Sequence, residues 1–133
     1  MRGIVFCKSL NKGNAELINL SEKYKMMNIK SELRMRKEGN VLMCDNGDYW
    51  KVTKANIHAC GSRCNVAYIE RTISVYEYLQ FIAPALTDFP FSAIHLWGEG
   101  NLHIDDCPEE IRDEEERRLN YLKMLDGVHM KGG

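Results

Sequence analysis

The sequence has few of the features that mark secreted, membrane-spanning or disordered chains. It contains 3 prolines in 133 residues, and 44% of its residues are hydrophobic, which is the composition of an ordinary folded domain. No apolar run approaches the roughly 20 residues that cross a bilayer. The apolar stretch near the N-terminus, GIVFC, is too short for a signal peptide, and no cleavage site of small residues follows it. We therefore expect residues 1–133 to form one globular domain in the cytoplasm.

The cysteines lack the pattern of a disulfide framework. There are 5 of them, at irregular spacing: Cys7, Cys44, Cys60, Cys64 and Cys107. Small secreted domains that are held together by disulfides carry an even number. We expect reduced thiols in an intracellular protein, with Cys7 and Cys44 acting as small hydrophobic side chains.

The complete motifs of several enzyme classes are also missing. The sequence has no H-x-E with P-C-x-x-C, as zinc deaminases need, and neither H-E-x-x-H nor G-x-S-x-G. It has no P-loop, G-x-x-x-x-G-K-[ST], and no G-x-G-x-x-G of dinucleotide-binding domains. We expect no autonomous ATP hydrolysis, and we favour a protein without catalytic activity or bound cofactor.

Short apolar or alternating segments predict the strands. Residues 3–9, 65–70 and 91–97 are apolar and rich in β-forming side chains, so they predict buried strands. Residues 29–36 alternate between apolar and charged side chains, which is typical of a half-exposed strand. The dipeptide Asn46-Gly47 lies between two further apolar segments and indicates a β-hairpin with a type I′ turn.

Capping residues predict three helices. Asn14 can cap the first, and Ser74 with Glu77 forms a capping box for the second, which Pro84 should kink or end. The buried face of the second helix is expected to comprise Tyr76, Leu79, Ile82 or Ala83, and Leu86. An acidic third helix is expected around residues 106–126. The predicted fold is a single α/β domain, with α+β as the alternative, in which three helices pack on a mixed sheet of about six strands.

Charge is distributed unevenly along the chain. Residues 1–40 carry a net charge of +5 and residues 101–133 a net charge of −4, although the whole chain carries −1. Two solvated faces would explain this asymmetry, and so would surfaces that bind charged partners. The basic front could bind nucleic acid through Arg2, Lys8, Lys12, Lys30, Arg34, Arg36 and Lys37, together with Arg63. The near-neutral total charge and the lack of a known nucleic-acid motif count against this alternative.

The acidic tail suggests a protein partner instead. Its carboxylates could meet a basic patch on that partner, and exposed aromatic side chains could anchor the contact. The candidate partner-binding residues are Asp105, Asp106, Glu109, Glu110, Asp113, Glu114, Glu115 and Glu116, with Tyr49, Trp50 and Trp97 as anchors. This interpretation is our leading one.

Two groups of residues could hold a metal ion. His58, Cys60 and Cys64 supply three possible zinc ligands, but no spacing singles out a fourth. A cysteine-containing loop that leads into a buried strand explains the same residues. The segment from His95 to Asp106 gathers imidazoles and carboxylates after a predicted strand and suggests a metal-dependent hydrolase as a further alternative.

The order of elements in residues 3–71 resembles part of a known family. A strand, a polar turn and a helix (GIVFCKSLNKGNAELINLSEKY) precede a hairpin (DNGDYWKV), a Gly-Ser-Arg loop and a strand that ends on an acid (NVAYIE). This order is similar to the region after the P-loop in the ATPase cores of phage terminase large subunits. The resemblance implies that Glu70 lies where those proteins have their Walker B acid, which organises Mg²⁺ and water.

The same resemblance has clear departures. The P-loop strand and helix are absent, the loop reads Gly61-Ser62-Arg63 rather than Arg-Gly, and the strand ends Glu70-Arg71 rather than Asp-Glu. The resemblance therefore implies a phage or prophage protein that keeps part of this fold without its ATPase activity. Our leading functional hypothesis is a small non-enzymatic protein of this kind, an inhibitor or adaptor that binds a macromolecular partner.

Overall fold

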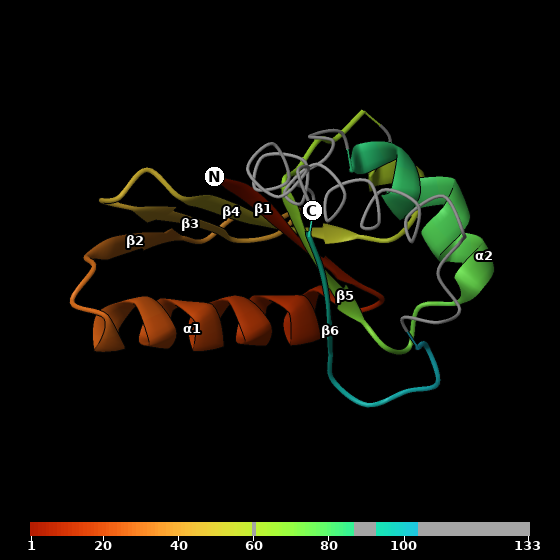
Figure 1. The fold of residues 1–133 in the computed structure, drawn as a ribbon, viewed down its shortest axis with the longest axis horizontal. Coiled ribbons are helices and arrows are strands. Elements are labelled where there is room, and N and C mark those ends of the chain that lie inside the picture. Colours follow the sequence, from red (N-terminus) through yellow and green to blue (C-terminus); the bar gives the residue numbers. More distant parts are fainter. Residues whose placement is uncertain (60, 87–92, 104–133) are drawn as a thin grey trace, which may run out of the picture.

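The computed structural model describes residues 1–59, 61–86 and 93–103. They form one six-stranded sheet in the order β2-β3-β4-β1-β5-β6 (Figure 1). The strands β4, β1, β5 and β6 are parallel, whereas β3 is antiparallel to both of its neighbours. The strands are β1 (Arg2–Cys7), β2 (Ser31–Arg34), β3 (Val41–Cys44), β4 (Tyr49–Lys54), β5 (Val66–Glu70) and β6 (Ala93–Trp97). The predicted mixed sheet of about six strands is confirmed.

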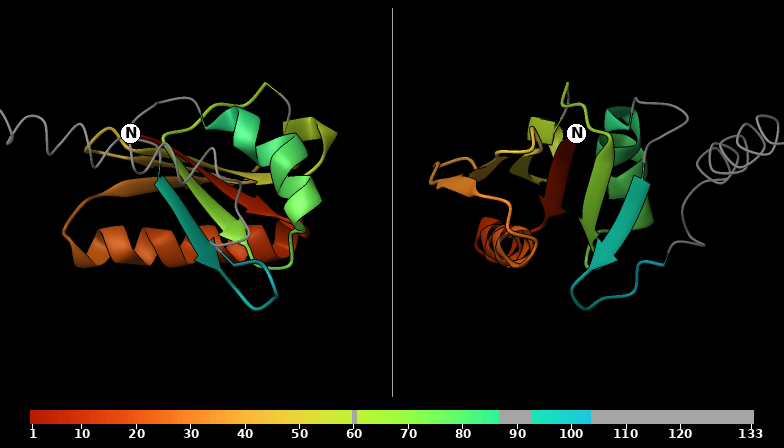
Figure 2. Two further views of the ribbon diagram at one scale, coloured as in Figure 1. Left: turned by 45° about the vertical axis from the view of Figure 1, so that its right-hand side comes forward. Right: turned by 60° about the vertical axis from the view of Figure 1, so that its left-hand side comes forward.

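Helices cover opposite faces of this sheet at different places. The helix α1 (Leu10–Met26) packs on one face against β2, β3, β4 and β1. On the other face, α2 (Val75–Glu77) continues through a π-helical turn, η2 (Tyr78–Ile82), and a 3₁₀ turn, η3 (Ala83–Ala85). Figure 2 shows that this second helical segment lies on the side of the sheet away from α1. The two layers are therefore offset, and each covers a different half of the sheet.

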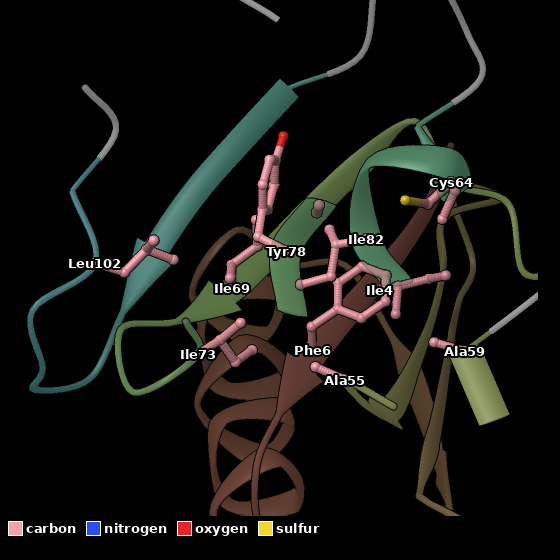
Figure 3. Close-up of a cluster of buried hydrophobic side chains, with 12 residues drawn as sticks. Ile4, Phe6, Ala55, Ala59, Cys64, Ile69, Ile73, Tyr78, Ile82 and Leu102 are labelled. Atoms are coloured by element: carbon pink, nitrogen blue, oxygen red, sulfur yellow. The ribbon is translucent and has the colours of Figure 1, made fainter. Parts of the chain in front are cut away.

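The core is divided accordingly into two clusters. The first lies under α1 and contains Val5, Leu17, Leu42, Trp50 and Val52 among others. The second lies under the α2 segment and joins side chains of β1 and β5 to Tyr78 and Ile82 (Figure 3). Successive residues of a strand face opposite sides of a sheet, so β1 sends Val5 into the first cluster and Phe6 into the second.

The β3–β4 hairpin is present where Asn46-Gly47 predicted it, but its turn differs from the expected one. A type I′ turn needs positive φ at both central residues, and here Gly47 has φ +95° while Asn46 is not at positive φ. The Asn46 side chain instead accepts a hydrogen bond from the Asp48 amide at 3.0 Å. This side-chain turn and the hydrogen bond from the Cys44 amide to the Asp48 carbonyl oxygen close the loop between β3 and β4. The loop is longer than the two residues of a type I′ turn.

The prediction for the start of α1 is wrong. The helix begins at Leu10, with Ser9 as its N-cap, and Asn14 lies within it. The Asn14 side chain accepts a hydrogen bond from the Asn40 amide at 2.9 Å, so its polar group links the helix to a distant loop.

The capping box at the start of α2 is confirmed, because Ser74 and Glu77 each accept the other's backbone amide. The predicted buried face is wrong in part. Tyr76 and Leu79 are exposed, whereas Tyr78, Ile82 and Ala85 are buried. A π-helical turn contains one residue more than a turn of regular α-helix, so it breaks the regular spacing of buried residues. The buried face of this segment therefore contains Tyr78 instead of Tyr76 and Leu79. The chain leaves the helix after Ala85, near Pro84 as expected.

Further predictions concern the cysteines, the membrane and the third helix. Cys7, Cys44 and Cys64 are buried, and Cys7 and Cys44 are free thiols. Among the described residues, none of the helices has the length and apolar character that a membrane span requires. The predicted acidic helix at residues 106–126 lies outside the described residues.

Candidate nucleic-acid interface

The strand β4 separates its side chains between the core under α1 and the opposite face of the sheet. Trp50 and Val52 are 3% exposed and pack under α1. Tyr49 and Lys51 alternate with them and therefore lie on the opposite face. On that face the α2 segment packs over β1, β5 and β6. Near Tyr49 and Lys51, the 3₁₀ turn η1 (Ile57–Ala59) contacts β4, and its His58 borders the same hollow as these two residues.

Two hollows meet at Tyr49 and Lys51. The larger has a volume of about 480 Å³ and lies between these residues and the loop at residues 36–39. The smaller has a volume of about 300 Å³ and lies between them and the loop at residues 61–63. The Lys51 ammonium group donates a hydrogen bond to the Ser62 hydroxyl at 3.1 Å, and this bond fixes the second loop beside β4. We call the two hollows together the basic groove.

Cations outnumber carboxylates among the side chains that line the basic groove. The charged lining residues are Arg2, Arg36, Lys51, Lys54 and Arg63, with Glu38 as the single carboxylate. None of the five cations forms an ion pair with a described residue. Arg34, which lies outside the groove on the edge strand β2, pairs instead with Glu32 at 3.3 Å. Among the described residues the groove therefore carries a net positive charge, which favours an anionic ligand.

The first wall of the groove, residues 36–40, is held by the buried side chain of Asn40. Its side-chain oxygen accepts the Arg36 amide at 3.1 Å, and its backbone oxygen accepts the Val52 amide at 3.0 Å. Its own amide donates to Asn14 on α1. This loop is thereby tied to β4 and to α1, so Arg36 projects from a fixed position.

Glycine lets this wall approach β4 closely. Gly39 has φ +131°, and a Cβ atom there would lie 2.2 Å from the Val52 carbonyl oxygen. Gly61, in the second wall, also has a positive φ, +84°, but a Cβ atom there would meet nothing within 4 Å. The first wall therefore needs glycine for space, and the second needs it for backbone conformation alone.

The structure brings together part of the predicted basic front. Arg2, Arg36 and Arg63 line the basic groove. Lys37 is exposed beside it in the first wall, and Arg34 lies on the neighbouring strand. The remaining members lie elsewhere: Lys30 near the end of α1, Lys12 on α1, and Lys8 at the end of β1.

Sequence reasoning missed Lys51 and Lys54. The alternation Tyr49-Trp50-Lys51-Val52 would have identified Lys51, since a lysine between two core residues of a strand lies on the opposite face.

Of the predicted protein-binding residues, the structure describes the aromatic anchors but not the acidic segment. Trp50 is 3% exposed, so the prediction that it is an exposed anchor is wrong. Its indole nitrogen donates to the Tyr24 hydroxyl at 2.9 Å inside the first core cluster. Trp97 is half-buried, and Tyr49 is half-buried in the groove. The acidic residues from Asp105 to Glu116 lie outside the described residues.

The predicted metal ligands are not brought together in the part of the chain that the structure describes. His58 is exposed on the 3₁₀ turn η1 (Ile57–Ala59), whereas Cys64 is 2% exposed in the second core cluster. Cys60 lies outside the described residues. On β6, the His95 ring packs on Tyr68, with centroids 5.1 Å apart. Within the described ranges no group of three potential metal ligands is found.

The carboxyl ends of the parallel strands form a second polar region, the carboxyl edge. Ligands of open α/β sheets commonly bind where successive connections leave to opposite faces, as they do here after β1 and β5. Glu70 is 3% exposed, and its carboxylate accepts the Lys8 amide at 3.0 Å. The Lys8 ammonium group lies 2.9 Å and 2.8 Å from the two carboxylate oxygens of Glu77. Lys8 and Glu77 thus form an ion pair, and the Glu70 carboxylate is bonded to the Lys8 backbone.

Two side chains at this edge have shifted pKa values. Burial raises the pKa of Glu77, but the bonds from Lys8 and from the Ser74 amide and hydroxyl outweigh it, so the pKa lies below its ordinary value. Burial, followed by the negative charge of Glu70, raises the pKa of the Cys7 thiol to about 11. Cys7 is therefore a neutral thiol at neutral pH.

Comparison with known proteins finds similarity in the fold alone. No protein-family model and no curated protein matches the chain. The structure is similar to the large terminase ATPase domain of Thermus phage P74-26, with a TM-score of 0.51 and 10% sequence identity over 77% of this chain. A mutant of that domain matches equally well. The resemblance seen in the sequence is confirmed at the level of the fold, and this chain spans about half the length of that domain, 49%.

Proposed function

We propose that this chain is a non-enzymatic binding protein of phage or prophage type that holds nucleic acid in the basic groove. The observation that carries the proposal is the set of five cationic lining residues that form no ion pair with a described residue. Phosphate groups would supply the missing negative charge. The fold likeness to a phage terminase domain supports the phage assignment.

The chemistry of the lining suits a nucleic-acid backbone. Arginine binds phosphate oxygens through two parallel N–H groups, and Arg2 and Arg63 both line the smaller hollow. The Ser62 hydroxyl beside them can add a neutral hydrogen bond. Strand β4 supports the middle of the groove, and the Asn40 bonds support its first wall, so few groups would need to be ordered on binding.

Salt dependence tests this proposal. Fluorescence anisotropy of a labelled oligonucleotide would be measured between about 50 and 200 mM salt, because each phosphate contact steepens the decline of affinity with salt. The double variant Lys51→Gln/Arg63→Gln removes two groove cations and should lower the slope of log K against log salt by roughly 1.4 to 1.8.

The matched control removes the same charge elsewhere. Lys25 and Lys30 lie near the end of α1, in a different hollow, and Lys25→Gln/Lys30→Gln should bind like the unmodified protein. Absence of binding at about 50 mM salt would refute the proposal. An equal loss in the control variant would refute it too, since it would mean that net charge, rather than the groove, attracts the oligonucleotide.

A protein partner of the acidic segment remains a separate proposal, in the manner of an inhibitor or adaptor. It depends on residues that the structure does not describe, and its support is the concentration of carboxylates between Asp105 and Glu116. The triple variant Glu114→Gln/Glu115→Gln/Glu116→Gln should abolish capture of such a partner. The Lys51→Gln/Arg63→Gln variant should leave that capture unchanged.

A further inference from the structure

The position of Tyr49 indicates which kind of nucleic acid the groove would take. Tyr49 lines both hollows and so lies at their junction, next to Lys51. Two other rings of the sheet pack on aromatic neighbours: Trp50 packs edge-on against Tyr68 at 4.9 Å, and Tyr68 in turn contacts His95. Tyr49 makes no ring contact and no side-chain hydrogen bond with a described residue. Its half-buried ring therefore has no stacking or hydrogen-bond partner among the described residues, although its backbone is fixed in β4.

The cations are placed on both sides of that ring. Arg36 and Lys54 line the larger hollow, Arg2 and Arg63 line the smaller one, and Lys51 lines both. A phosphate chain that crossed β4 from the first wall to the second would meet positive charge at each step. A base attached to the middle of that chain would lie beside Tyr49.

The shape of the site separates single strands from duplexes. Proteins that read duplex DNA insert a helix or a β-ribbon into a groove about 12 Å wide. Here the basic residues line hollows beside a strand rather than a projecting element. Volumes of about 480 and 300 Å³ are in the range of sites that enclose a small organic group, such as a nucleotide. A sheet surface on which unpaired bases stack against aromatic side chains is a common solution for single strands.

We propose that the basic groove binds single-stranded nucleic acid, with one base stacked on Tyr49 and the flanking phosphates on the cations of the two hollows. The proposal rests on the proposed function and specifies its ligand. Stacking on an aromatic ring tolerates any base, so binding should show little sequence preference.

The test compares single strands with duplexes, using variants of Tyr49. The unmodified protein should bind a single strand of about 12 nucleotides more tightly than a duplex of the same length or a mononucleotide. Tyr49→Leu should weaken single-strand binding by roughly 5- to 150-fold, the cost of losing one stacked base. Tyr49→Phe keeps the ring and should retain the affinity. Urea denaturation of each variant verifies that the fold is intact.

Photocrosslinking locates the contact directly. A single strand that carries 5-iodouridine should crosslink to Tyr49 on irradiation, and mass spectrometry of the digested product identifies the modified residue. The crosslink should persist in the Lys25→Gln/Lys30→Gln control.

The outcomes distinguish the two proposals. Equal affinity for duplex and single strand, or a Tyr49→Leu variant that binds normally, would overturn the stacking inference. If Lys51→Gln/Arg63→Gln still weakened binding in that case, the proposed function would stand. A mononucleotide that bound as tightly as the strand would overturn the inference as well. Absence of binding to every probe would overturn both.

Discussion

The basic groove is built around β4, whereas the carboxyl edge lies at the ends of β1 and β5, and the charged groups of these two regions have different partners. At the edge, the Lys8 ammonium group contacts both carboxylate oxygens of Glu77, and the buried Glu70 carboxylate accepts the Lys8 amide. In the groove, Arg2, Lys51 and Arg63 have no carboxylate partner among the described residues. The edge has the position that ligands of α/β sheets usually occupy, yet Lys8 there already bonds to Glu77 through its ammonium group and to Glu70 through its backbone amide.

This difference shows why position in a fold is insufficient to locate a site. Charged groups that pair internally stabilise local structure and gain little from a ligand, since binding would first have to break those pairs. Charged groups without partners gain an interaction when an ion of opposite sign arrives. The fold likeness to a terminase ATPase domain draws attention to Glu70, but the arrangement of unpaired charge favours the groove.

The largest expected effect comes from the first wall of the groove. Gly39→Ala would place a Cβ atom 2.2 Å from the Val52 carbonyl oxygen in a residue with φ +131°, so either the loop or β4 must move. We expect a loss of about 3 kcal/mol or more in the free energy of unfolding, measured by urea denaturation. Oligonucleotide affinity should fall with it, because Arg36 would lose its position.

Gly61 provides the matched control in the second wall. Gly61→Ala keeps the strain of a positive φ but meets nothing within 4 Å, so it should cost only about 1–2 kcal/mol. Equal destabilisation by the two variants would contradict the close approach of the first wall to β4.

A smaller effect is expected at Asn40, whose side chain holds the same wall. Asn40→Ala removes the acceptor of the Arg36 amide in a residue that is 2% exposed. We expect a loss of about 1–3 kcal/mol in stability, as for other buried polar groups left without a partner. Binding of a single strand should weaken more than in an equally destabilised core variant away from the groove, such as Leu20→Ala on α1. Retention of full affinity would show that the wall contributes nothing to the groove.

Much of the fold could be predicted from local sequence, because the relevant forces act over a few residues. The capping box of Ser74 and Glu77 and the hairpin at Asn46-Gly47 are fixed by neighbours along the chain. The errors occur where distant residues decide the outcome. Asn14 resembles an N-cap, but its side chain bonds to Asn40, 26 residues away. Tyr76 fits a regular helical stripe, but a π-helical turn buries Tyr78 in its place.

The candidate site was less predictable for the same reason. Arg36 and Arg63 were predicted from the charge pattern, but nothing local indicates that they line adjoining hollows on either side of β4. Trp50 was expected at the surface because aromatic residues often anchor interfaces. The strand register instead places it under α1, bonded to Tyr24, and leaves Tyr49 on the opposite face. Which of two adjacent aromatics faces outward depends on the packing of the whole sheet.

The smallest expected effect concerns pH and the internal charge pairing of the carboxyl edge. The folded-state pKa of Glu77 lies below its ordinary value of 4.5, mainly because the bonds from Lys8 and Ser74 outweigh burial. The unfolded state therefore binds a proton more readily than the folded state does. The stabilisation from Glu77 is present above the unfolded pKa and is lost as the pH falls below 4.5 through the folded pKa.

Glu77→Gln should remove this contribution and flatten the pH dependence of stability below pH 4.5, as measured by urea denaturation at a series of pH values. The effect should be less than about 1 kcal/mol, because the Lys8–Glu77 pair is partly exposed to solvent. The pKa of Asp48 is also lowered, since bonds from Tyr24 and Asn46 outweigh its burial, so Asp48→Asn serves as an independent acid-sensitive reference. Single-strand affinity at neutral pH should be unchanged in Glu77→Gln. A change there would mean that the carboxyl edge and the basic groove act as one site, because removing a carboxylate from the edge would then alter how the groove cations bind phosphate.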